Sequence, residues 1–329
     1  MSKVVLGIEG TAWNLSASVV NEERVISEAE SSYVPEKGGI HPREAAQHHA
    51  SVIKDVIRDA LASAKDEGYA PKEISGVAFS QGPGLGPCLR TVATAARTIS
   101  LSLDIPLIGV NHCVAHIEVG RWNCNIKDPV VLYTSGANSQ VLSYRDGKYR
   151  IFGETLDIGI GNALDKFGRH AGLKHPGGPK IEAHAKDSNN YIPLPYVVKG
   201  MDFSFSGLVT AAKDALSNAP LADVCYSLQE TAFAMMVEVT ERAMAHCGKD
   251  ELLLVGGVGA NTRLKEMLKR MCEDRNATFA APENRFMKDN GAMIAHTGRI
   301  MLESGLSTPI DQSYVRADYR PDDVEITWL

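Results

Sequence analysis

The chain of 329 residues is longer than a typical single domain and long enough for two lobes that each bury a core. Its 44% hydrophobic and 22% charged residues are an ordinary globular balance, and the formal net charge of -6 excludes a generally cationic surface for nucleic acid. Six scattered cysteines without a C-x-x-C pair indicate reduced thiols, and no signal-peptide run or membrane-spanning run stands out, so we expect a cytoplasmic protein.

The first patterned segment is VVLGIEGTAWNLSASVVNEERVISEAES, which predicts three strands joined by a turn of small residues and by a charged turn. The segment PVVLYTSGANSQVLSYRDGKYRIFGETL repeats this plan later in the chain. Two matching β-turn-β units predict a duplicated fold with a cleft between its halves. Because small turn residues let backbone amides approach an anion, Glu9, Gly10 and Thr11 form a candidate phosphate turn.

Helical material lies between the two units. HPREAAQHHASVIKDVIRDALASAK has apolar residues near helical spacing, and the strand GVAFS runs into a Gly/Pro loop that opens a second helix. The following GVNHCVAHIEVG holds His112 and His116, which a helix would place on one face as a pair of metal ligands. A structural histidine pair is the alternative. A helical metalloprotease motif would carry its glutamate where Cys113 stands.

Beyond the second unit, residues 159–186 form a polar section rich in glycine and histidine, and a proline-spaced loop leads through DFSFSG to a long helix. ELLLVGGVGANTRL predicts a strand, a glycine loop and a helix that can approach a nucleotide, although the spacing fits neither a Walker loop nor G-x-G-x-x-G. A tight strand-to-helix turn explains this segment equally well. Strands that alternate with helices in both halves predict an α/β fold.

A series of longer motifs runs in order from about Val4 to Trp328: GIEGTA, HPREAAQHH, SQGPGLGPCLR, NHCVAHIE, YTSGANSQ, GNALDKFGR, HPGGPKIE, DFSFSG, GGVGAN and DNGAMIA. With these motifs the chain resembles the tRNA threonylcarbamoyladenosine synthesis family, also called glycoprotease-like, and especially its archaeal and eukaryotic branch that works in the KEOPS assembly. The resemblance implies an actin-like, Hsp70-like, sugar-kinase-like (ASKHA) fold, in which duplicated RNase H-like subdomains form two lobes around a central nucleotide cleft. We expect an N-terminal lobe over residues 1–128 and a C-terminal lobe over residues 129–329, whose last segment packs back on the first lobe.

The resemblance also implies the site residues. One divalent metal per subunit would be bound by His112, His116, Tyr133 and Asp289; the resemblance favours iron, which a phenolate oxygen suits, with zinc as the alternative. Taken singly, a buried strand tyrosine and a helix N-cap would explain Tyr133 and Asp289. The substrate or an adenine nucleotide would contact Tyr133, Thr134, Ser135, Gly136, Ala137, Asp165, Gly178, Glu182, Gly256, Gly257 and Asn261. Ala137 departs from the family pattern, which has a second glycine there, and its Cβ restricts the loop.

The activity that the resemblance implies is an acyl transfer. The threonylcarbamoyl group moves from threonylcarbamoyl-AMP to the exocyclic amine of the adenine beside the anticodon, in tRNAs that read codons starting with A. A metal would polarise the carbonyl or hold the phosphate, and no residue stands out as general base. The alternatives are an ATPase or small-molecule kinase of the same fold, which Glu9 disfavours because many such kinases have aspartate there, and a metalloprotease, as the older family name suggests.

The resemblance implies several partners besides tRNA. They are a small kinase or ATPase as a separate subunit, small dimerising or accessory subunits of a KEOPS-type complex, and an upstream ligase that supplies threonylcarbamoyl-AMP; no membrane is involved. Basic residues cluster between two substrate motifs, and of these Lys166, Arg169 and Lys174 are candidate RNA contacts. A solvated loop is the alternative. The net charge of -6 predicts that the chain alone binds tRNA weakly.

Overall fold

The computed structural model describes residues 3–35 and 39–329 and divides into two compact units, neither of which is continuous in sequence. Unit 1 consists of Met1–Val119, Asp146–Tyr149 and Lys288–Leu329, and unit 2 consists of Gly120–Arg145 and Arg150–Met287. The lobe boundary after residue 128 stays a prediction. Among the described residues, none of the helices combines the length and the apolar character that a bilayer crossing requires.

Unit 1 is built on a mixed sheet, five-stranded within the described residues, with the order β3-β2-β1-β4-β5. Its strands are β1 (Val5–Glu9), β2 (Asn14–Val20), β3 (Val25–Ser32), β4 (Gly76–Gly82) and β5 (Leu107–Asn111). β1 pairs antiparallel with β2 and parallel with β4, and β4 pairs parallel with β5. β1, β2, β4 and β5 are buried along their whole length, as expected for strands that are covered on both faces.

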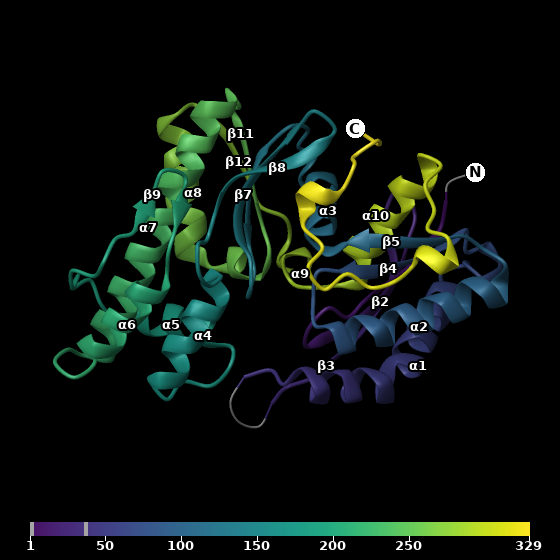
Figure 1. Cartoon of the computed structure of the whole chain (residues 1–329), viewed down its shortest axis with the longest axis horizontal. Helices are drawn as coiled ribbons and strands as arrows, with labels where there is room; N and C mark the ends of the chain where they lie inside the picture. The colour runs from purple at the N-terminus through teal and green to yellow at the C-terminus, as the bar shows by residue number, and fades with distance from the viewer. Residues whose placement is uncertain (1–2, 36–38) are drawn as a thin grey trace. The chain divides into compact units, whose positions relative to one another are not determined.

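Helices cover both faces of this sheet (Figure 1). They are α1 (Pro42–Asp66), α2 (Gly86–Leu103) and α10 (Gly291–Glu303). α1 and α2 pack on the face to which Ile8 points, since these elements share one apolar cluster. α10 packs on the opposite face at Gly7, where a Cβ would come within 2.3 Å of the backbone nitrogen of Ala295. Glycine at position 7 therefore sets how closely α10 approaches the sheet.

α3 (His112–Cys124) begins at the carboxyl end of β5, which lies beside the carboxyl end of β4, and its residues from Gly120 on are counted in unit 2. The short 3-10 helices of unit 1 are η1 (Pro71–Glu73), which precedes β4, η3 (Ile310–Gln312) and η4 (Pro321–Asp323). The C-terminal segment, defined here as residues 313–326, runs across these strand ends. The backbone nitrogen of Arg316 donates to the carbonyl of Gln81 at 2.8 Å, and the Gln81 side chain donates to the carbonyl of Tyr314 at 2.9 Å. This segment therefore braces the point at which α3 begins.

Unit 2 repeats the sheet of unit 1. Its strands are β6 (Val130–Thr134), β7 (Ser139–Arg145), β8 (Lys148–Glu154), β11 (Glu251–Val255) and β12 (Thr278–Ala280), with the first two residues of β8 counted in unit 1. Read from its other end, the order is β8-β7-β6-β11-β12, which corresponds strand for strand to β3-β2-β1-β4-β5 of the first sheet. As β1 does in the first sheet, β6 pairs antiparallel with the next strand, β7, and parallel with β11. The predicted α/β class and the duplicated β-turn-β units are thus confirmed.

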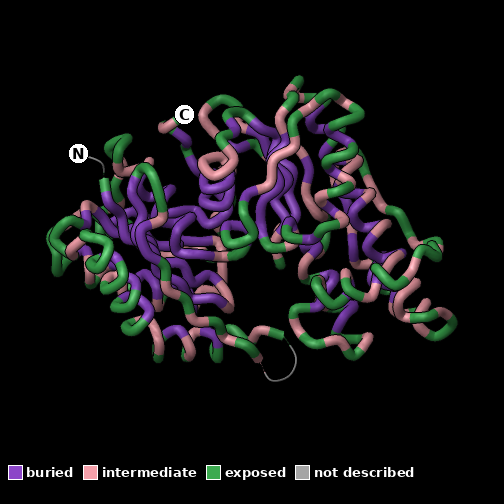
Figure 2. Tube along the Cα trace, turned by 180° about the vertical axis from the view of Figure 1, so that it is seen from behind, coloured by how far each residue is buried: buried purple, intermediate pink, exposed green. Residues whose placement is uncertain are grey.

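The remaining elements of unit 2 pack around this second sheet. They are α4 (Ile160–His170), α5 (Gly177–Ala185), β9 (Val198–Lys199), β10 (Asp202–Phe203), α6 (Ser206–Ala215), α7 (Leu221–Cys247), η2 (Gly257–Ala260), α8 (Thr262–Asp274) and α9 (Asn284–Met287). The long helix α7 contributes residues such as Phe233 and Met236 to an apolar core that also includes Val130 and Leu254 of the strands. In Figure 2 the central strands of each unit are mostly purple, as expected for two separate buried cores, while β3, β8 and β12 are largely intermediate or exposed.

Candidate functional site

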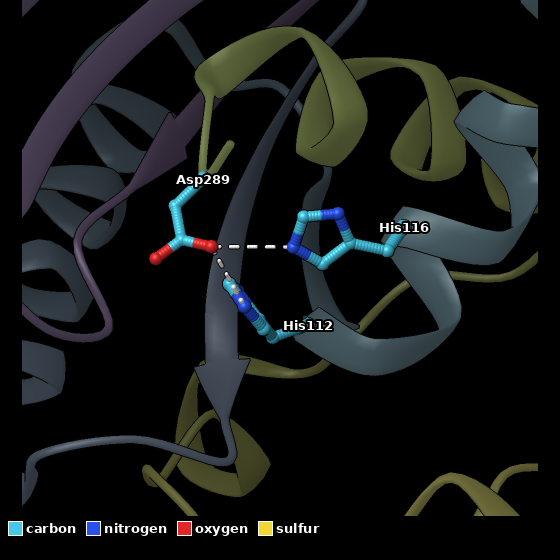
Figure 3. A group of neighbouring side chains, drawn as sticks. All are labelled: His112, His116 and Asp289. Atoms are coloured by element: carbon cyan, nitrogen blue, oxygen red, sulfur yellow. Dashed lines mark hydrogen bonds and ion pairs between the residues drawn. The ribbon is translucent and has the colours of Figure 1, made fainter. Parts of the chain in front are cut away.

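Three potential metal ligands converge within unit 1 (Figure 3). The Nε2 atom of His112 lies 3.3 Å from Oδ1 of Asp289, and the Nε2 atom of His116 lies 3.2 Å from the same oxygen. One ligand atom from each residue lies within 4.8 Å of the others. Two imidazoles and a carboxylate are donors that iron and zinc both accept, so the residues fit a divalent metal.

Local structure explains how these side chains come to face one another. Residues four apart on α3 project from one face, so the two imidazoles are neighbours, with ring centroids 4.9 Å apart. Asn111 starts α3, because its Oδ1 accepts from the backbone nitrogens of Cys113 at 2.9 Å and Val114 at 3.1 Å. This cap was not singled out from the sequence, although an asparagine directly before a helix is its usual signal.

Asp289 lies just before α10 and is held by its backbone. Its carbonyl accepts from Nδ2 of Asn14 at 2.9 Å. The N-cap of α10 is Asn290, whose side chain accepts from the backbone nitrogen of Met293 at 2.8 Å. The carboxylate of Asp289 is therefore not needed for capping and turns to the histidines instead.

The electrostatics of the group favour a cation. Burial lowers the pKa of His112, but the carboxylates of Glu9 and Asp289 outweigh burial and raise that pKa well above its usual value of 6.5. Burial raises the pKa of Asp289, yet the two histidines more than offset it and hold that pKa well below its usual range. Burial lowers the pKa of His116. The two carboxylates thus stabilise a positive charge on His112, and a divalent metal bound at its Nε2 would take the place of a proton there.

Tyr133, the other predicted ligand, belongs to unit 2. It lies in β6, in register with Gln140 of β7 and Val255 of β11, and it is 1% exposed. Its role as a metal ligand stays a prediction.

The backbone amides of the candidate phosphate turn of unit 1 already donate to side chains of the protein. The backbone nitrogen of Gly10 donates to Oγ of Ser80 at 3.3 Å, and that of Thr11 donates to Oε1 of Glu9 at 2.7 Å. A phosphate would compete with these acceptors for the amides. The structure also reveals that Glu9 contacts His112, which the sequence did not indicate, because the two residues are 103 positions apart.

The turn between β6 and β7 is the corresponding loop of unit 2. The backbone nitrogens of Gly161 and Asn162, at the start of α4, donate to the carbonyls of Ser135 at 3.1 Å and Gly136 at 2.9 Å. α4 therefore fixes the shape of the turn. Ala137, which departs from the family pattern, is exposed and is not among the residues with positive φ, so its Cβ is compatible with this backbone.

The glycine loop after β11 combines a structural glycine with an open one. Gly256 has a φ of +91°, and a Cβ there would lie 2.4 Å from the carbonyl oxygen of Thr134, so this position requires glycine. A Cβ at Gly257 would meet no atom within 4 Å. Asn261 caps α8, since its Oδ1 accepts from the backbone nitrogen of Leu264 at 3.1 Å, and its Nδ2 donates to Gln229 at 3.0 Å. The tight-turn interpretation thus holds at Gly256, while Gly257 offers open backbone.

Other predicted substrate residues lie near this loop or on α4 and α5. Oε1 of Glu182 accepts from the backbone nitrogen of Thr262 at 2.9 Å, which joins α5 to the start of α8. Oδ1 of Asp165 accepts from the backbone nitrogen of Gly177 at 2.6 Å, next to Gly178, and its Oδ2 lies 3.2 Å from Nδ1 of His175. The three candidate RNA contacts are exposed at or just beyond α4; they are Lys166, Arg169 and Lys174. The roles of all these residues stay predictions.

Solved structures with a similar fold include HypF from T. kodakarensis, with a TM-score of 0.64 at 15% identity, over 93% of this chain and 48% of that one. Another is the activator of the 2-hydroxyisocaproyl-CoA dehydratase from Clostridium difficile, with a TM-score of 0.55 at 12% identity, over 93% of this chain and 97% of that one. Together with the repeated sheets, these likenesses confirm the predicted ASKHA-type fold. The nucleotide cleft stays a prediction.

Similar sequences are found in methanogenic archaea. The chain is 66% identical to a tRNA N6-adenosine threonylcarbamoyltransferase of Methanococcoides burtonii. The alignment of 325 residues covers 99% of this chain and 97% of that protein. The chain is 67% identical to a probable bifunctional tRNA threonylcarbamoyladenosine biosynthesis protein of Methanosarcina mazei, of whose length it spans 59%. Residues 24–296 match a family model described as TsaD: tRNA N6-adenosine threonylcarbamoyltransferase. The chain therefore belongs to the TsaD family.

Proposed function

We propose that the chain transfers a threonylcarbamoyl group from threonylcarbamoyl-AMP to the N6 amine of the adenine beside the anticodon of tRNA. The observation that carries this proposal is the family match over residues 24–296, together with a relative of that name that is 66% identical along nearly its whole length. The match favours neither the kinase nor the protease alternative. For the protease, α3 carries the buried Cys113 where a helical general base would stand.

The proposed reaction replaces one bond to the carbamoyl carbon by another. The N6 nitrogen attacks the carbonyl carbon of the mixed anhydride, the bond from this carbon to the phosphate oxygen breaks, and AMP leaves with the electron pair while the nitrogen loses a proton. A divalent metal, which we propose to be iron, would supply Lewis-acid chemistry at the substrate oxygens. His112, His116 and Asp289 would hold it, with Tyr133 as a further ligand. We assign no general base, because Glu9 and Asp289 are both engaged with the histidines.

The adenosine part of the donor would occupy the loops of unit 2. Gly257 is supported by its open backbone, and Glu182 and Asn261 are supported by their positions beside the same loop. The exposed side chains of Lys166, Arg169 and Lys174 would contact tRNA phosphates. A separate kinase or ATPase subunit and small accessory subunits of a KEOPS-type complex would complete the assembly, and we propose that it works in the cytoplasm.

Product analysis tests the proposal. The chain is mixed with tRNA, threonine, bicarbonate, ATP, an adenylate-forming ligase and the accessory subunits, and the tRNA is digested to nucleosides. We expect threonylcarbamoyladenosine to form in an amount that depends on the chain. Its absence, with threonylcarbamoyl-AMP detected in the mixture, would refute the activity.

The metal centre has a separate test. The double variant His112→Ala/His116→Ala should lose bound metal by elemental analysis and stay folded by circular dichroism. His246→Ala is the control, since this histidine is exposed on α7 and lies outside the candidate sites. Metal content in the double variant equal to that of the control would exclude this site.

A further inference from the structure

The ring of His112 is held from both of its nitrogens. On one side its Nε2 lies 3.3 Å from Oδ1 of Asp289, among the potential ligand atoms. On the other side its Nδ1 lies 3.1 Å from Oε2 of Glu9. Since the nitrogen that faces a metal must offer its lone pair, the proton of the neutral ring belongs on Nδ1. Nδ1–H then donates to the carboxylate of Glu9.

Glu9 is itself fixed in place. It is the last residue of β1, its side chain is 0% exposed, and Oε1 accepts from the backbone nitrogen of Thr11 at 2.7 Å. Each carboxylate oxygen thus has its own donor, so the group cannot rotate without losing a hydrogen bond. Oγ1 of Thr11 also lies 3.4 Å from Nδ1 of His112. The turn that follows β1 therefore sets the orientation of the histidine.

Glu9 is not a ligand in this arrangement. The three residues whose ligand atoms converge, within the part of the chain that the structure describes, are His112, His116 and Asp289. Glu9 reaches the histidine from the Nδ1 side of the ring. A carboxylate that accepts from the second nitrogen of a metal-binding histidine fixes the tautomer and the ring orientation, and it makes the ligand nitrogen more basic.

We propose that Glu9 is a positioning residue of the metal centre, which holds His112 with Nε2 directed at the metal and ties this ligand to the turn Glu9–Thr11. The inference rests on the proposed metal centre. Many kinases of this fold have an aspartate at the position of Glu9. In this chain the proposed role of Glu9 is to orient a metal ligand. This role also accounts for a fully buried carboxylate at the end of a central strand, since two hydrogen bonds compensate its charge.

The experiment measures the affinity of the full-length chain for Zn²⁺ alone, in competition with a chromophoric chelator. The variants are Glu9→Ala and Glu9→Gln. Glu118→Gln is the matched control, because Glu118 is also a buried carboxylate, lies on α3 itself, and accepts a hydrogen bond from Tyr149 at 2.6 Å. The melting temperature of each metal-free variant reports separately on folding.

We expect Glu9→Ala to raise the Kd for Zn²⁺ by about 10- to 100-fold, the usual loss when such an outer partner is removed. Glu9→Gln keeps an acceptor but no charge, so its Kd should lie between those of the parent and the alanine variant. Glu118→Gln should bind like the parent. Histidine-selective ¹⁵N NMR of the Zn²⁺-loaded parent should show the His112 proton on Nδ1.

A Kd for both Glu9 variants equal to that of the parent would overturn the inference, as would an Nε2–H tautomer of His112 in the loaded parent. If Glu9→Ala does not fold, the Glu9→Gln result decides alone. A parent chain that binds Zn²⁺ equally well with and without His112 and His116 would instead exclude the metal centre, and the inference with it. The product assay tests the transferase activity independently of both outcomes.

Discussion

Replacing Asn111 by alanine tests how the ligand helix is anchored. This residue is 3% exposed and links two parts of unit 1. Its Oδ1 accepts from the first free amides of α3, those of Cys113 and Val114. Its Nδ2 donates to the carbonyls of Tyr319 at 3.0 Å and Arg320 at 3.2 Å, in the C-terminal segment. Alanine removes all of these hydrogen bonds.

The magnitude follows from two losses. An N-cap is worth about 1 kcal/mol, within a range of roughly 0.5–2. The carbonyls that lose their donor belong to Tyr319, which is half-buried, and Arg320, which is exposed, so this loss costs about 0.5–1.5 kcal/mol, the net worth of an ordinary hydrogen bond. We therefore expect Asn111→Ala to lower the free energy of unfolding of unit 1 by about 1.5–2.5 kcal/mol.

Hydrogen–deuterium exchange locates the effect. In Asn111→Ala, peptides from the start of α3 and from the C-terminal segment should both exchange faster than in the parent. Asn111→Asp is the matched variant: it keeps the oxygen that caps α3 but loses the donor, so only the C-terminal segment should exchange faster. Parent-like exchange at both places in Asn111→Ala, with an unfolding free energy within about 0.5 kcal/mol of the parent, would refute this reasoning.

Three further predictions concern pH, nucleotide and RNA. Burial, assisted by the charge of His48, lowers the pKa of His49 from 6.5 to about 4. Between these two pH values the unfolded state binds a proton at His49 that the folded state does not bind. The free energy of unfolding should therefore fall by up to ~3 kcal/mol as the pH is lowered from about 6.5 to about 4. His49→Gln should flatten this fall in urea titrations, and parallel curves for variant and parent would contradict it. The variant Gly257→Val should fold normally, since a Cβ at this position meets no neighbouring atom, but it should raise the Kd for an adenine nucleotide about tenfold or more. An unchanged Kd in calorimetry would contradict nucleotide binding at this glycine loop. Lys166→Ala with Lys174→Ala should weaken tRNA binding and reduce its salt slope by about one unit per lost phosphate contact, with metal binding unchanged; equal affinity and slope would place the RNA elsewhere.

The sequence by itself determined the features that depend on near neighbours in the chain. The i, i+4 spacing of His112 and His116 is enough to place both rings on one face of a helix. The repeated alternation of apolar, small and charged residues is enough to predict two β-turn-β units, which the matching strand orders confirm. The glycine loop after residue 255 was predicted as a strand-to-helix connection from its composition alone.

Only the tertiary structure decided which distant residues meet. Asp289 is 173 positions from His116, so no periodicity links them, and in the sequence only the family resemblance named Asp289 as a ligand. Glu9 is 103 positions from His112, and nothing in the sequence indicated their contact. Likewise, Gly256 and Gly257 look alike in the sequence, yet only Gly256 packs against the carbonyl of Thr134 and needs its positive φ. Such contacts depend on how the strands order themselves in a sheet and on how closely a helix packs against it. Pairing and packing of this kind join residues through space, and local spacing along the chain carries no record of them.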